Sequence, residues 1–82
     1  MHDVCLDERL WEAIEAGQQA RVERWLVTEG EHVSAGQVLA HVRLLHELVD
    51  LPASHTGVIE AILVAPGEGF GHGAVLARVV PL

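Results

Sequence analysis

Residues 21–42, RVERWLVTEGEHVSAGQVLAHV, align without a gap with residues 58–79, VIEAILVAPGEGFGHGAVLARV, at an offset of 37 positions. Ten aligned positions are identical: Glu23/Glu60, Leu26/Leu63, Val27/Val64, Gly30/Gly67, Glu31/Glu68, Gly36/Gly73, Val38/Val75, Leu39/Leu76, Ala40/Ala77 and Val42/Val79. Two copies of such a repeat are too few to build a solenoid. The repeat therefore predicts one pseudo-twofold domain in which each half covers the other.

Each half is predicted to form a strand, a turn and a second strand. The turns read GEHVSAG at 30–36 and GEGFGHG at 67–73, and glycine supplies the positive φ angles that tight turns require. The glycine-rich second turn does not match GxGxxG, and a P-loop needs a lysine that the chain lacks. We therefore interpret both segments as structural turns.

Alternating residues indicate a strand after each turn. Val38, Ala40 and Val42 are expected on one face of the first of these strands, with His41 on the other. Arg78 is the counterpart of His41 in the second half.

The strands before the turns show the same period of two. This spacing places Val22 and Leu26 on one face, and their equivalents Ile59 and Leu63 on one face. Short strands separated by glycine and proline predict an all-β domain, a small sandwich or barrel.

Residues 7–19 support two conflicting interpretations. The stretch DERLWEAIEAGQQARVERWL, with Leu10 and Ile14 at helical spacing, is typical of an amphipathic helix that Gly17 would end. The repeat instead predicts a strand at residues 21–27, because the aligned VIEAILV is rich in β-branched residues. The structure of residues 7–19 therefore stays open.

Composition excludes several classes of function. The chain has 82 residues, half of them apolar, a net charge of −7 and no lysine. An acidic domain repels phosphate backbones and anionic lipid surfaces, so neither nucleic acid nor a membrane is an expected partner. No apolar stretch approaches the ~20 residues that span a bilayer. The N-terminus lacks the apolar core of a secretory signal, so we expect a cytoplasmic protein.

The single cysteine, Cys5, permits no internal disulfide bond. Its acidic neighbours Asp3 and Asp7 disfavour a thiolate, which argues against a nucleophilic role.

The segment between the halves, residues 41–57, reads HVRLLHELVDLPASHTG. Its VRLL and LVDLPA can pair as a hairpin with a turn near Leu44–Glu47. The chain resembles the biotinyl/lipoyl-carrier domain family in the order of three segments. These are WLVTEGEHVSAGQVLAHV, then a hairpin, then VDLPASHTGVIEAILVAPGEGFGHGAVLARV. It is most similar to the lipoyl domains of 2-oxo acid dehydrogenase acyltransferase subunits, with a few residues inserted before Trp25.

The resemblance implies a lipoyl-like barrel-sandwich hybrid, a flattened barrel of two four-stranded antiparallel sheets related by a pseudo-twofold axis. It also implies a single domain over residues 1–82. The repeat halves would then lie at about 20–42 and 57–79, and the central hairpin at 43–56.

In the family, a lysine at the tip of this hairpin carries lipoate or biotin, and in lipoyl domains it usually follows an aspartate and precedes an alanine. Aligned without gaps, that trio falls on Leu45, His46 and Glu47, so His46 stands where the modified lysine would be. An amide-linked cofactor needs an amine on a flexible stem, whereas imidazole is shorter and acyl-imidazoles hydrolyse readily. We therefore expect no cofactor.

Three interpretations of the hairpin tip remain open. His46 can be a solvated turn residue without a role. Alternatively, Leu45, His46 and Leu48 form a recognition tip, because Leu44 can turn inward whereas Leu45 and Leu48 cannot both do so. The third interpretation is a metal site, although the histidines show no HxxxH or HExxH spacing. Those histidines are His32, His41, His46, His55 and His72.

No carboxylate pair, Ser-His-Asp set or Cys-His set can be assigned, so we expect no enzyme activity and assign no metal ligand. We expect a protein-interaction module that contacts another protein through Leu45, His46 and Leu48, with the acidic residues 7–15 as a secondary surface. The resemblance implies a 2-oxo acid dehydrogenase or related multienzyme component as partner. Two alternatives stay open. One is a carrier domain of 2-oxo acid dehydrogenase or carboxylase type with a non-lysine attachment, and the other is a histidine metal-binding domain.

Overall fold

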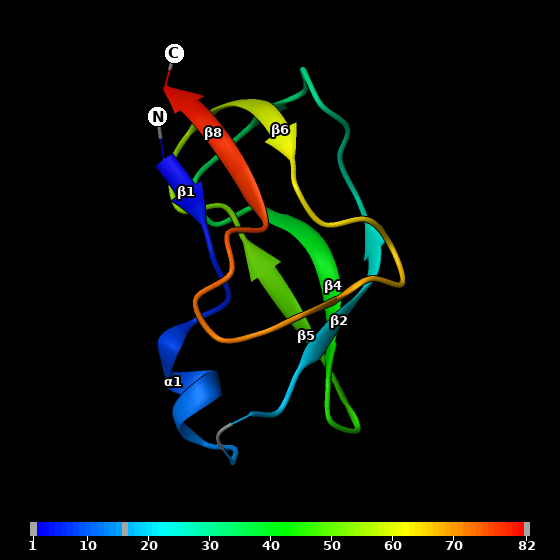
Figure 1. The fold of residues 1–82 in the computed structure, drawn as a ribbon. Coiled ribbons are helices and arrows are strands. Elements are labelled where there is room, and N and C mark those ends of the chain that lie inside the picture. The colour runs from blue at the N-terminus through cyan, green and yellow to red at the C-terminus, as the bar shows by residue number, and fades with distance from the viewer. Residues whose placement is uncertain (1, 16, 82) are drawn as a thin grey trace.

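The computed structural model describes residues 2–15 and 17–81, which form two four-stranded antiparallel sheets (Figure 1). One sheet has the order β1-β8-β6-β3 and the other β5-β4-β2-β7. The strands are β1 (His2–Val4), β2 (Ala20–Trp25), β3 (His32–Val33), β4 (Val38–Leu44), β5 (Glu47–Pro52), β6 (Gly57–Ile62), β7 (Gly69–Phe70) and β8 (Ala77–Pro81). The predicted all-β fold with two four-stranded sheets is confirmed.

The pseudo-twofold relationship is visible in backbone hydrogen bonds between the two repeats. The amide of Gly30 donates to the carbonyl oxygen of Ile59 at 2.7 Å, and the equivalent Gly67 donates to Val22, also at 2.7 Å. Both glycines have positive φ, 89° and 83°, which the turn requires and which glycine adopts without steric cost. The turn of each repeat is thus bonded to the first strand of the other.

A bulge in β2 turns Leu26 away from the face on which the sequence predicts it. The pairing of β2 with β4 shifts register between Val22 and Arg24, which interrupts the period of two. Val27 is therefore buried, whereas Leu26 is 40% exposed, and its equivalent Leu63 is 45% exposed. The prediction that these leucines share a face with the buried residues of the same strands is wrong, because the sequence period does not reveal the bulges.

The strand after the first turn follows the predicted alternation only in part. Ala40 and Val42 are fully buried and His41 is half-buried, as expected. Leu39 is also fully buried, because the pairing of β4 with β5 shifts register between Val38 and Ala40. The core lies between the two sheets, and its largest fully buried side chains are Leu39, Leu51, Ile59, Leu76, Val4, Val22, Val42 and Val79.

The helical interpretation of residues 7–19 holds for one short segment, α1 (Glu8–Glu12). Asp7 caps it by accepting a hydrogen bond from the backbone amide of Arg9. The buried Trp11 packs edge-on against Phe70, which fixes α1 to the sandwich. The helix ends before Gly17, and β2 forms where the repeat predicts a strand. Within the described ranges, no helix has the length and apolarity needed to cross a membrane.

Candidate functional site

The predicted hairpin is formed by β4 and β5 and closes with the two-residue turn Leu45-His46. Val42 lies opposite Val49, and Leu44 opposite Glu47, so the turn falls where the sequence predicts it. The turn lies at the end of the molecule opposite the two chain termini (Figure 1).

Leu45 holds an unusual backbone conformation. Its φ angle is +57°, and among the described residues it is the only non-glycine residue with a positive φ. A bulky residue in this left-handed region is an outlier that costs roughly 1–3 kcal/mol. Leucine thus occupies a position where glycine, asparagine or aspartate would fit the backbone better.

The leucines of the hairpin end divide between the core and the surface. Leu44 is 6% exposed and belongs to the core, whereas Leu45 and Leu48 are each 50% exposed. This matches the expectation that Leu44 turns inward and the other two do not. His46 lies beside them and is also exposed.

A groove of about 310 Å³ separates the hairpin end from α1 and the loop that follows it. Leu10, Ala13 and Ile14 line one side, and residues 44–47 with Val49 line the other. Most of the exposed lining is apolar. Sequence analysis missed the groove, although the helical spacing of Leu10 and Ile14 marked one of its walls.

A second, more polar cleft of about 250 Å³ lies on another side of Leu45. It is lined by Gln19, Ala20, Arg21, Arg43, Leu45 and Gly69. Arg21 and Arg43 face each other directly across β2 and β4. Sequence analysis missed this cleft because it depends on strand register.

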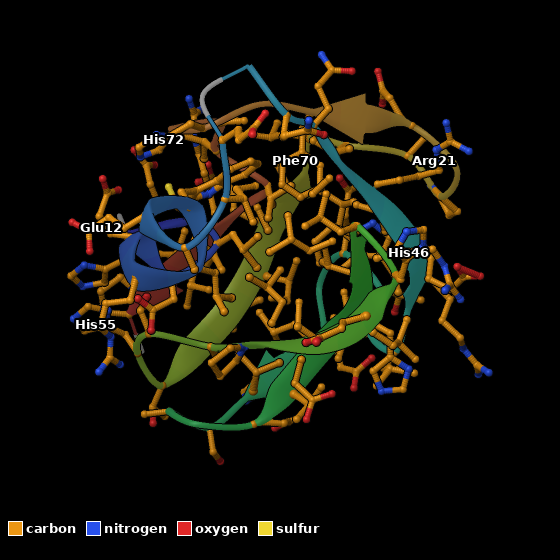
Figure 2. All side chains as sticks on the ribbon, turned by 90° about the horizontal axis from the view of Figure 1, so that it is seen from below. Glu12, Arg21, His46, His55, Phe70 and His72 are labelled. Carbon is orange, nitrogen blue, oxygen red and sulfur yellow. The ribbon has the colours of Figure 1, made fainter. Side chains whose placement is uncertain are left out.

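The five histidines considered as metal ligands do not converge on one site. His41 is 3.6 Å from a carboxylate oxygen of Asp50, and His72 is 2.7 Å from one of Glu8. The His55 ring stacks on His2 at 3.5 Å, far from His46 in Figure 2. Within residues 2–15 and 17–81, no three histidine, cysteine, aspartate or glutamate side chains are placed to hold a metal ion.

Cys5 lies in surroundings that disfavour its thiolate. Partial burial raises the pKa of the Cys5 thiol, and the nearby Asp3 carboxylate raises it further. Because the thiolate is the nucleophilic form, this environment makes the thiol less reactive.

The repeat, the paired sheets and the exposed central hairpin agree with a comparison to known families. The family model Biotin_lipoyl, described as "Biotin-requiring enzyme", matches residues 12–79. The chain belongs to this biotin/lipoyl carrier-domain family. The suspected resemblance is thereby confirmed at the level of the family, whose domains work with partner enzymes in multienzyme complexes.

Solved structures support the same fold. The chain is similar to part of the crystal structure of the Kluyveromyces lactis urea carboxylase, with a TM-score of 0.71 and 22% sequence identity. The match covers 79% of this chain and 6% of that much longer one. No curated protein sequence matches the chain. At this identity the similarity extends to the fold alone.

Proposed function

We propose that this member of the biotin/lipoyl family carries no lysine-linked cofactor and is not an enzyme, but binds another protein through its hairpin end. The chain contains no lysine, and His46 occupies the turn where the family's modified residue is expected. Imidazole lacks the amine needed for a stable amide. The hairpin is therefore free to act as a contact surface instead of as an arm.

The observation that carries this proposal is the exposure of two leucines beside His46. Leu45 and Leu48 are each 50% exposed, and the turn between β4 and β5 lies at the end of the molecule opposite the termini (Figure 1). Clustered apolar side chains at an exposed tip are typical of interaction sites. The positive φ of Leu45 adds to the argument, since strained residues often serve function.

The proposed partner is an enzyme component of a multienzyme assembly, because the carrier domains of this family work beside such components. A 2-oxo acid dehydrogenase or a carboxylase component fits this class. The acidic residues 7–15 form a secondary surface in this proposal. Two of its carboxylates are already engaged, since Asp7 pairs with Arg9 and Glu8 with His72.

Intact-mass measurement on the protein purified from its source cells tests the first half of the proposal. The expected mass is that of the unmodified polypeptide. A covalent adduct of lipoyl or biotinyl type would instead favour a carrier with a non-lysine attachment.

A binding experiment tests the second half. The wild-type protein is used to capture a partner, and the affinity of the purified partner is then measured by calorimetry. The doubly substituted Leu45→Asp/Leu48→Asp protein should lose at least about tenfold in affinity, because removing a central apolar contact usually costs more than ~1 kcal/mol.

The chain offers a matched control in Leu26→Asp/Leu63→Asp. These leucines are 40% and 45% exposed, close to the exposure of Leu45 and Leu48, but they directly follow β2 and β6. The control should bind like the wild-type protein. Equal weakening by both double variants would show a nonspecific effect and contradict the proposed surface.

A further inference from the structure

The arginines of the chain differ in whether they form ion pairs with carboxylates. Three of the five form ion pairs: Arg9 with Asp7 at 3.0 Å, Arg43 with Glu23 at 2.9 Å, and Arg78 with Asp3 at 3.6 Å. The other two, Arg21 and Arg24, both lie in β2 and have no acidic partner within the described ranges. The chain has a net charge of −7, and among the described residues its arginines without an acidic partner both lie in one strand.

Arg21 also lies directly opposite another arginine. Arg21 and Arg43 are Cα partners in the antiparallel pair of β2 and β4. Like charges in this arrangement are destabilising. Glu23 accepts one hydrogen bond, from Nε of Arg43, whereas a guanidinium group carries five N–H donors. Donors of both arginines therefore remain for an external anion.

The cleft extends past Arg21 to Gly69, on the side of β2 away from Arg43. This glycine lies opposite Arg21 in β7 and lines the cleft of about 250 Å³. A Cβ atom at position 69 would lie 3.4 Å from Oε1 of Gln19, in ordinary van der Waals contact. Glycine therefore leaves room next to Arg21 that a larger residue would fill.

Leu45 connects the arginine cleft to the proposed contact surface. Its side chain lines both this cleft and the apolar groove beside α1. Arg21 and His46 lie on the same side of the molecule, away from Glu12, His55 and His72 (Figure 2). A bound segment that crosses Leu45 would meet arginines on one side and apolar side chains on the other.

We propose that the cleft between Arg21 and Arg43 binds a carboxylate of the partner protein, contributed by an acidic side chain that lies next to an apolar one. The acidic side chain enters the cleft, and the apolar side chain enters the groove across Leu45. Guanidinium groups bind carboxylates through paired, charge-assisted hydrogen bonds. That this carboxylate belongs to a protein rests on the proposed function.

The cleft itself can be tested without a partner. Backbone amide resonances of the protein are recorded by NMR while N-acetylglutamate α-amide, which has a free side-chain carboxylate, is titrated in. N-acetylglutamine α-amide and inorganic phosphate serve as comparison ligands. Saturable shifts at Gln19, Arg21, Leu45 and Gly69 are expected for the glutamate ligand. Absence of saturation, equal binding of the glutamine ligand or tighter binding of phosphate would each overturn the proposal.

Two matched variants locate the site. Arg21→Gln should weaken binding of the glutamate ligand about tenfold, the loss expected for a charge-assisted hydrogen bond. Arg24→Gln removes the same charge from the same strand, but outside the cleft, and should change affinity less than about twofold. Equal effects of both variants would point to general electrostatic attraction and contradict a defined site.

The captured partner separates this inference from the proposed function. If Leu45→Asp/Leu48→Asp abolishes partner binding and Arg21→Gln weakens it about tenfold, both hold. If only the leucine variant weakens partner binding, the contact surface is supported and the proposed carboxylate site is wrong. If the glutamate ligand binds but no partner uses the hairpin, the proposed function fails and a protein carboxylate is not the ligand.

Discussion

The indole Nε1 of Trp25 donates a hydrogen bond of 2.8 Å to the carbonyl oxygen of Val64 and so joins the first repeat to the second. The equivalent of Trp25 in the second repeat is Ile62, whose side chain has no donor. This connection therefore exists once and breaks the pseudo-twofold symmetry. It supplements the symmetric backbone bonds between each turn and the opposite repeat.

Replacing Trp25 by phenylalanine should lower the free energy of unfolding by about 1–2 kcal/mol. The substitution keeps an aromatic ring but leaves the carbonyl of Val64 without this donor, and an unmade bond at a partly buried site costs about this much. Urea unfolding followed by circular dichroism measures the difference. A change below about 0.3 kcal/mol would mean that water replaces the indole without loss.

Gly57 should tolerate no side chain. A Cβ atom at this position would collide with the carbonyl oxygen of Val80 and approach Cγ1 of Val79 to 2.8 Å, where β6 pairs with β8. We expect Gly57→Ala to lower the unfolding free energy by at least about 2 kcal/mol, because overpacking against backbone cannot be relieved by a rotamer change.

Gly71→Ala is the matched control for this prediction. Its Cβ atom would meet nothing within 4 Å, and its φ lies outside the left-handed region. Thermal unfolding of both variants should show a clear fall in midpoint for Gly57→Ala and almost none for Gly71→Ala. Similar falls would indicate that chain flexibility, and not the contact with Val80, sets the cost.

The repeat made most of the fold predictable from the sequence. A gapless offset fixes which strands are equivalent, and the register obeys it: Trp25 pairs with Ala40, and Ile62 with Ala77. The exposure of Leu26 was not predictable, because a bulge adds one residue to a strand without changing its hydrophobic pattern. The bulge recurs in β6, between Ile59 and Ala61, so both repeats carry the same deviation.

The candidate site was predictable where it depends on local sequence. The two-residue turn followed from the gapless alignment, and the inward orientation of Leu44 followed from alternation. The arginine cleft was not predictable, because Arg21 and Arg43 are far apart in sequence and meet only through the register of β2 and β4. Nothing in their local sequence marks them as a pair.

Leu45 and Leu44 should respond very differently to the same substitution. Leu45→Asp should lower the unfolding free energy by no more than about 0.5 kcal/mol, because Leu45 is half exposed and aspartate tolerates its positive φ. Leu44→Asp should cost more than about 3 kcal/mol, since it places a charge in the core. Chemical denaturation compares the two. Unfolding of the Leu45→Asp protein would show that Leu45 belongs to the core and contradict the contact surface.

The cap of α1 should make stability depend on pH in the acidic range. Hydrogen bonds from the side chain of Arg9, and then from its backbone amide, hold the pKa of Asp7 below its ordinary value of 3.8. A carboxyl group whose pKa is lowered by folding stabilises the folded state at pH values above its unfolded pKa. That stabilisation is lost as pH falls through the lower, folded pKa.

Asp7→Asn isolates this contribution of charge. Asparagine still caps the helix by accepting the amide hydrogen bond, but it has no charge to pair with Arg9. Unfolding midpoints measured between neutral pH and about pH 2 should fall less steeply for Asp7→Asn than for the wild-type protein below about pH 4. Because Asp7→Ala also removes the cap, it should be less stable than Asp7→Asn throughout this range. Parallel pH profiles for the wild-type protein and Asp7→Asn would show that the pair with Arg9 contributes nothing to folding.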